Sequence, residues 1–114
     1  MKRKLIVALD SGTSEQQDAI TNYIRNRGWR VWHWLADVWL LADVPASVSP
    51  KSLWSDLIAV PALESARGFV MTTGNDATYW GSIDGRCWDW MSEYWGIPDS
   101  IPPGLGSRRG SVTA

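Results

Sequence analysis

The alternation of apolar and polar positions along this chain predicts four strands and two helices. A buried strand is expected at residues 4–9, an apolar run that stops at Asp10. Two more strands are expected at 29–35 and 38–44, where successive side chains point to opposite faces, and a fourth at 68–73. Helical spacing of apolar residues follows the first strand and the third strand.

Polar residues mark the ends of both helices. Ser14 is expected to cap the first helix, with Gln17 completing a capping box. Gly28 suits the left-handed position just past its end. In the second helix, Ser49 is the expected cap and Pro50 the first helical residue.

This order of elements predicts the fold class α+β, as a ferredoxin-like βαββαβ sandwich. Two helices would cover one face of a four-stranded antiparallel sheet with strand order 4-1-3-2. A C-terminal aromatic helix is expected at 86–95, with Trp88 and Trp95 on one side. Residues 1–96 would form the domain, and 97–114, rich in Gly, Pro and Ser, a disordered tail.

Composition narrows the class of protein. The 114 residues, 45% of them hydrophobic, suffice for one domain, and no apolar run is long enough to span a bilayer. The single cysteine, Cys87, excludes an internal disulfide and a multi-cysteine zinc site. No export signal is evident, so a cytoplasmic protein is expected. A net charge of −1 argues against tight, non-specific binding of nucleic acid.

Nine tryptophans are the most informative feature of the composition. Strand alternation places Trp32 and Trp34 on the sheet face opposite Trp29, so two helices cannot cover them all. Exposed indoles would form an apolar patch that monomers rarely tolerate. The aromatic helix, a second subunit or a ligand should cover this face. The predicted interface residues are Trp32, Trp34, Trp88 and Trp95.

A pair of carboxylates is the candidate metal site. Because strands one and three are expected to be antiparallel neighbours, Asp10 and Asp37 should lie close together at one rim of the sheet. Two carboxylates there could hold Mg²⁺, which binds a few carboxylates and keeps several waters. The favoured alternative is that Asp10 begins a turn and caps a helix.

Three other candidates are better explained as structural. His33 could act as a base or ligand, but it lacks an orienting partner in sequence. Cys87 lies among tryptophans and is expected to be an inert thiol. Residues 72–76 could bind phosphate through backbone donors, although a surface turn is favoured. That loop should lie at the opposite end of the sheet from Asp10.

The chain contains a set of short motifs: Asp10 at the end of the first strand, Trp32-His33-Trp34-Leu35, Trp39-Leu40, Val70, Gly74 and Trp88-Asp89-Trp90. Together these motifs resemble the small bacterial SinR-like proteins, which are distinct from the sporulation repressor of similar name. That family is grouped with the small CRISPR-associated adaptation subunit and its toxin relatives. The resemblance implies a ferredoxin-like fold and, for some relatives, a symmetric dimer. In nuclease-like relatives the aspartate ending the first strand, here Asp10, is the proposed metal ligand.

The leading hypothesis is a small non-enzymatic interaction protein. It would be a homodimer that binds a protein partner through its tryptophan-rich surface, and the resemblance suggests a mobile-element or defence context. No catalytic residue and no cofactor are assigned under this hypothesis. The alternative is a divalent-metal-dependent nuclease acting on RNA or DNA, with Mg²⁺ held by Asp10 and Asp37.

Overall fold

The chain forms two compact units, residues 1–73 and 74–114. The computed structural model describes residues 2–74, 78–79, 82 and 85–98. In the described part of the chain, no helix is long and apolar enough to cross a membrane.

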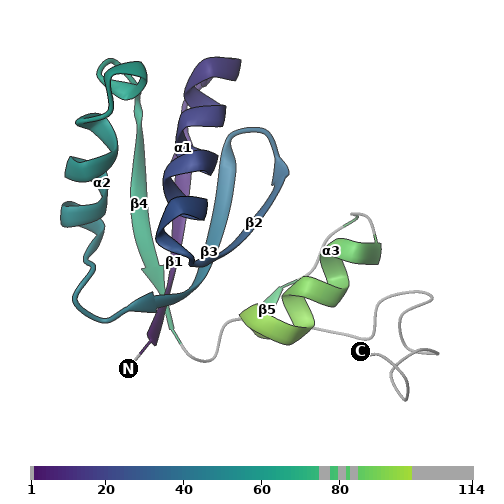
Figure 1. The fold of residues 1–114 in the computed structure, drawn as a ribbon. Helices are drawn as coiled ribbons and strands as arrows, with labels where there is room; N and C mark the ends of the chain where they lie inside the picture. The colour runs from purple at the N-terminus through teal and green to yellow at the C-terminus, as the bar shows by residue number, and fades with distance from the viewer. Residues whose placement is uncertain (1, 75–77, 80–81, 83–84, 99–114) are drawn as a thin grey trace. The chain divides into compact units, whose positions relative to one another are not determined.

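The first unit is an α+β layer structure, as predicted. Its four strands form one open antiparallel sheet in the order β2-β3-β1-β4. The predicted pairing of the first strand with the third is confirmed. Both helices lie on the same face of this sheet (Figure 1). The elements are β1 (Lys2–Leu9), α1 (Ser14–Arg27), β2 (Arg30–Leu35), β3 (Val38–Pro45), α2 (Pro50–Ile58), the 3₁₀ turn η1 (Pro61–Leu63) and β4 (Gly68–Thr73).

The core lies between the sheet and the two helices. Leu5 and Val7 of β1 point into it and are fully buried. They pack with Ile24 of α1 and Leu57 of α2 in a single hydrophobic cluster. Trp39 of β3 is also fully buried there, so one of the nine indoles is part of the core itself. Because successive side chains of a strand point to opposite faces, the strand neighbours of these core residues lie on the sheet face away from the helices.

Both helices begin and end with the types of capping residue that the sequence predicts, but the cap of α1 lies one residue earlier than predicted. Helix α1 is capped by Thr13, whose side chain accepts a hydrogen bond from Gln16 N–H in a capping box, and not by Ser14 and Gln17 as predicted. The shift is local, because Thr13 and Gln16 offer the same chemistry one residue earlier. Gly28 adopts the predicted left-handed conformation, and Ser49 caps α2 before Pro50.

Strand β3 contains a β-bulge that the pattern of apolar residues did not reveal. The register against β1 shifts between Arg3 and Leu5, and Asp43 has a φ of 59° in the left-handed region. Asp tolerates this conformation better than most residues because its short polar side chain can bond locally. The bulge lets β3 run through Pro45, one residue past the predicted end.

The second unit differs from the predicted single helix. It contains β5 (Thr78–Tyr79), α3 (Gly85–Trp90), the π-helical turn η2 (Met91–Trp95) and β6 (Ile97–Pro98). Strands β5 and β6 form a separate parallel two-stranded sheet, so the strand order of the chain as a whole departs from the predicted βαββαβ order. Strand β6 falls inside the predicted tail, whose remaining residues, 99–114, lie outside the described part.

Candidate functional site

The sheet face opposite α1 and α2 is the main candidate surface. Register pairing aligns apolar residues of neighbouring strands on this face, because directly opposite residues in an antiparallel pair share a face. One row crosses all four strands, and a second row runs beside it. The first row is Phe69, Ala8, Val38 and Leu35, and the second is Met71, Ile6, Leu40 and Trp32.

Large apolar side chains of this face reach solvent. The exposed fractions are 43% for Trp34, 57% for Phe69 and 46% for Met71. Trp32 is different: its side chain is only 3% exposed, and its ring centre lies 5.8 Å from that of Trp34. The buried indole Nε1 of Trp32 has no hydrogen-bond partner among the described residues. Trp34 is therefore the predicted sheet tryptophan that offers substantial surface to another molecule.

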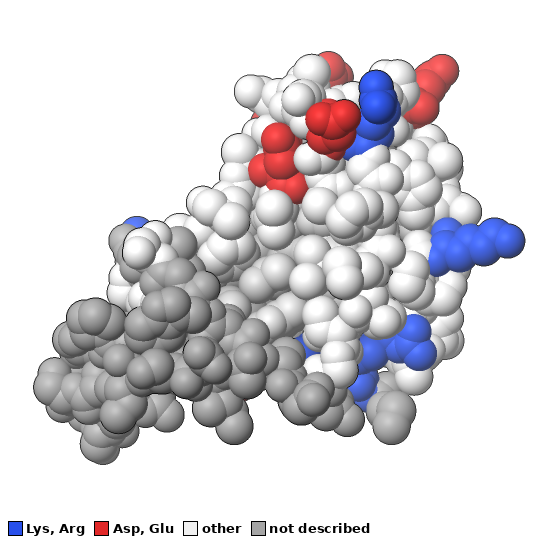
Figure 2. All heavy atoms as spheres, turned by 180° about the vertical axis from the view of Figure 1, so that it is seen from behind, with Lys and Arg blue, Asp and Glu red and all other residues white. Residues whose placement is uncertain are grey.

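Charges are segregated along this face. Figure 2 shows the molecule from behind the view of Figure 1: Asp and Glu gather at one end, Lys and Arg mainly toward the other, with uncharged surface between. The acidic end includes Asp10, which follows β1, and it also holds Arg67, 3.7 Å from the Asp10 carboxylate. The basic end includes Lys4 and Arg30, near the starts of the parallel-running β1 and β2. This polarity constrains which molecule fits the face.

The two predicted metal ligands do lie at the same rim. Leu9 N–H donates to the Asp37 carbonyl oxygen at 2.9 Å, which places the residue after it, Asp10, next to that turn. The carboxylate of Asp37, however, already accepts hydrogen bonds from Gly12 N–H and Gln17 Nε2, both at 3.1 Å. Within the described residues there is no group of three or more His, Cys, Asp or Glu that could hold a metal ion. Magnesium binding stays a prediction of the sequence.

The structural role of Asp37 can be measured directly. The Asp37→Ala substitution leaves two part-buried donors without their acceptor, so we expect it to lower the free energy of unfolding by about 1–2 kcal/mol. Urea denaturation followed by circular dichroism would give this value. Asp18→Ala, at an exposed position of α1, is the matched control and should change stability by less than about 0.5 kcal/mol. Equal effects of the two substitutions would contradict the structural role.

His33 is held by packing and one hydrogen bond. Its imidazole stacks on the Trp39 indole, with ring centres 4.3 Å apart and planes 4° apart. Its Nδ1 lies 3.0 Å from the Val38 carbonyl oxygen. The Trp39 indole in turn donates from Nε1 to Thr21 Oγ1 at 3.0 Å. These contacts support the structural explanation of the histidine that its sequence context favoured.

Two described tryptophans of the second unit are buried, and two other aromatic residues, Trp90 and Tyr94, are partly buried. Trp88 and Trp95, both predicted interface residues, are 7% and 5% exposed, and the Cys87 side chain is fully buried. A smaller aromatic cluster joins Trp90 to Tyr94 and Trp95, with ring centres 5.4 Å and 6.3 Å from that of Trp90. The buried position of Cys87 agrees with an inert thiol.

The end of β4, where the predicted loop at residues 72–76 begins, lies away from the carboxylate rim, as expected. Thr73 pairs with Lys4 near the start of β1, whereas Gly68, at the other end of β4, pairs with Leu9. The predicted turn at residues 72–76 is described only through residue 74, so its last two residues lie outside the described part.

Strand alternation could have revealed Phe69 and Met71 as functional candidates, because Val70 between them points to the core. The sequence-based prediction relied on the tryptophans and therefore named only β2 of this sheet as an interface strand.

Comparison of the chain with protein-family models, curated proteins and solved structures gives no match.

Proposed function

We propose that this protein is a non-enzymatic interaction protein that forms a homodimer through the sheet face opposite α1 and α2. The observation that carries the proposal is the exposure of Trp34, Phe69 and Met71 on that face. These side chains stand on the two outer strands, β2 and β4, and exposed large apolar side chains on one face mark a candidate interaction site. The partner is a second copy of the chain because the charges of the face complement themselves.

The charge pattern selects one geometry for this dimer. A two-fold axis in the plane of the interface and perpendicular to the strands would exchange the two ends of the face. It would place Asp10 of one copy toward Lys4 of the other. An axis parallel to the strands would instead bring like charges together. Charges at the rim of an interface set register and association rate more than affinity, so the apolar rows supply most of the binding energy.

The size of the face limits the strength of association. Four strands about 4.8 Å apart, each about six residues long at about 3.3 Å per residue, make a face of about 400 Å² in projection. Trp32 and Leu40 of this face are only 3% and 8% exposed, so the area open to a partner is smaller still. A standard stable interface buries about 800 Å² per partner. We therefore expect a reversible dimer with a Kd in the micromolar range.

The dimer is tested by introducing a charge into the apolar rows. Phe69→Glu places a carboxylate at an exposed position of the face, so it should leave the fold intact and weaken dimerisation at least tenfold. Sedimentation equilibrium over the micromolar range measures the Kd. Ile58→Glu, at an exposed apolar position of α2, is the matched control and should leave the Kd unchanged.

The geometry of the dimer has its own test. Lys4→Glu should weaken the dimer, and adding Asp10→Lys in the same chain should restore it. An unmodified protein that is monomeric throughout the micromolar range would overturn the proposed function. A dimer that is weakened equally by Phe69→Glu and Ile58→Glu would overturn the proposed interface.

The assignment of the first unit to the ferredoxin-like fold is also part of this proposal. The order β1-α1-β2-β3-α2-β4, with β1 paired to both β3 and β4, supports a ferredoxin-like first unit. A mobile-element or defence context rests on the SinR-like resemblance alone. A separate protein partner, contacted by Trp88 and Trp95, stays a prediction of the sequence.

A further inference from the structure

The outer edge of β4 is a second surface of the first unit, distinct from the apolar sheet face. In the described part of the chain, β1 is the one strand that pairs with β4, so the other side of β4 faces away from the sheet. Gly68 and Thr72 are exposed and Val70 is half-buried. An outer strand can accept another strand through its backbone groups. The backbone and side chains along this edge determine which strand fits.

The hydrogen bonds between β1 and β4 fix which backbone groups of β4 point outward. Asp10 N–H donates to the Arg67 carbonyl oxygen at 2.7 Å, so these two directly opposite residues form a hydrogen-bonded pair. Hydrogen-bonded and non-hydrogen-bonded pairs alternate along an antiparallel ladder. From Arg67 on, every second residue therefore directs its N–H and C=O toward β1. The residues between them direct theirs to the outer edge, and they are Gly68, Val70 and Thr72.

This edge is complementary to itself. When two copies pair antiparallel about a two-fold axis at Val70, Gly68 of each copy lies opposite Thr72 of the other. Every pair of outward-directed residues is then a hydrogen-bonded pair, which exchanges both of its N–H···O=C bonds. The same register places Phe69 opposite Met71 of the second copy, a favourable contact between a thioether and an aromatic ring. Moving the axis to a neighbouring residue leaves fewer hydrogen-bonded pairs within β4.

Helix α2 adds apolar side chains beside this edge. It lies at the β4 side of the sheet, with α1 on its other side (Figure 1). Asp56 of α2 accepts a hydrogen bond from the Tyr23 hydroxyl of α1 at 3.4 Å, so Asp56 marks the flank toward α1. Trp54 and Ile58 are two positions before and after Asp56, about 200° around the helix, and so lie on the flank away from α1. Ile58 is 38% exposed, and Trp54 is half-buried against the core.

We propose that the β4 edge pairs with the β4 edge of a second copy, which joins two four-stranded sheets into one continuous sheet. The strand carries no charged side chain, so self-pairing brings no like charges together. The α2 helices of the two copies lie beside each other across the axis, with Trp54 and Ile58 between them. This contact does not rest on the proposed face-to-face dimer. Its axis is perpendicular to the sheet, whereas the axis of that dimer lies in the plane of the sheet face.

Hydrogen exchange of the full chain, followed by NMR from micromolar to millimolar protein concentration, tests the pairing. The amides of Val70 and Thr72 should exchange about tenfold more slowly, or slower still, at high concentration, because pairing brings these N–H groups into hydrogen bonds. The amides of Phe69 and Met71 already bond to β1 and should change less. Exchange at Val70 and Thr72 that does not depend on concentration would overturn the proposal.

A proline at position 72 removes one outward N–H and leaves the hydrogen bonds to β1 in place. Proline is tolerated in an outer strand where the N–H faces away from the sheet, but it cannot donate to a new neighbour. Thr72→Pro should therefore raise the concentration at which Val70 becomes protected by about tenfold or more. Thr72→Ala keeps the N–H and is the matched control at the same position. Equal behaviour of the two variants would contradict pairing through this edge.

Cysteine cross-linking determines the register and does not depend on the proline variant. In the proposed register the Cα atoms of residues 69 and 71 of the two copies lie about 4.5 Å apart, within reach of a disulfide. The double variant Phe69→Cys/Met71→Cys should form a covalent dimer on oxidation, whereas either single variant should not. Facing sheets are about 10 Å apart, so the face-to-face dimer does not give this product. A cross-linked single variant, or a double variant that stays uncrosslinked, would overturn the register.

Failure of this proposal is distinguishable from failure of the proposed function. Ile58→Glu should weaken the protection of Val70 at high concentration, although it should leave the micromolar Kd of the face-to-face dimer unchanged. A dimer in sedimentation without protection of Val70 and Thr72 would overturn the edge pairing alone. A dimer that Thr72→Pro converts to monomer would instead support the edge and overturn the proposed sheet-face interface.

Discussion

Replacing Trp39 by alanine is expected to lower the free energy of unfolding by about 3–5 kcal/mol, the typical cost of deleting a fully buried Trp side chain. The indole is completely buried in the cluster between the sheet and both helices. The substitution removes the ring that stacks on His33 and the donor that bonds Thr21. Domains of this size have only about 5–15 kcal/mol of stability in total, so a large part of it would be lost.

Urea denaturation followed by far-ultraviolet circular dichroism measures this effect without relying on the deleted fluorophore. Trp34→Ala is the matched control. It is the same substitution on the neighbouring strand β2, but on the open face, where 43% of the residue is already exposed. It should cost less than about 1 kcal/mol. If the two variants were equally stable, the assignment of Trp39 to the core and Trp34 to the surface would be wrong.

Replacing Gly68 by alanine is expected to cost about 3 kcal/mol, the upper end of the range for inserting a methyl group into a tightly packed place. A Cβ at Gly68 would lie 2.1 Å from the backbone carbonyl oxygen of Ala8 on the adjacent strand. Backbone cannot move aside as a flexible side chain does. The first pair of β1 with β4, Leu9 with Gly68, would have to open.

Gly85→Ala is the control for this substitution. A Cβ at Gly85 would meet nothing within 4 Å, and alanine favours the helix that begins there. Its stability should equal or slightly exceed that of the unmodified protein. A Gly68→Ala variant with unchanged denaturation would show that β4 does not approach β1 as closely as described.

The first unit was largely predictable because its signals are local. The helix spacing, the left-handed Gly28 and the Ser49–Pro50 start each depend on a few neighbouring residues, and the structure bears them out. The cap of α1 was misplaced by one residue because Thr13–Gln16 and Ser14–Gln17 have the same spacing and chemistry. Local pattern cannot choose between two equivalent caps.

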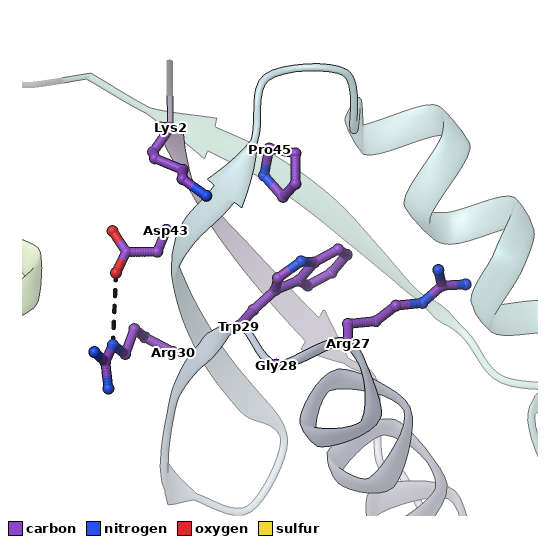
Figure 3. A pocket seen from close by; sticks show the side chains of 7 residues that line it. All are labelled: Lys2, Arg27, Gly28, Trp29, Arg30, Asp43 and Pro45. Carbon is purple, nitrogen blue, oxygen red and sulfur yellow. Dashed lines mark ion pairs between the residues drawn. The ribbon is translucent and has the colours of Figure 1, made fainter.

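The less predictable features depend on contacts distant in sequence. The bulge at Asp43 is defined by its register against Arg3 and Leu5, which apolar alternation does not encode. A hollow beside Asp43 is lined by residues of three separate segments, at positions 2, 27–30 and 43–45 (Figure 3), so no single sequence motif predicts it. In the second unit, the π-helical turn replaced a regular helix end over 91–95, and pattern alone could not show this wider winding.

The position of β4 as an edge strand of the sheet creates a risk of aggregation. It is an outer strand of its sheet, with β1 as its one strand neighbour among the described residues, and an outer strand offers an edge for pairing with another chain. Phe69-Val70-Met71-Thr72-Thr73 contains no charge, proline or further glycine, a composition that favours amyloid-like stacking. The opposite margin, β2, is interrupted by a register shift and begins with Arg30, both of which discourage such stacking. Aggregation of this protein would therefore start at β4.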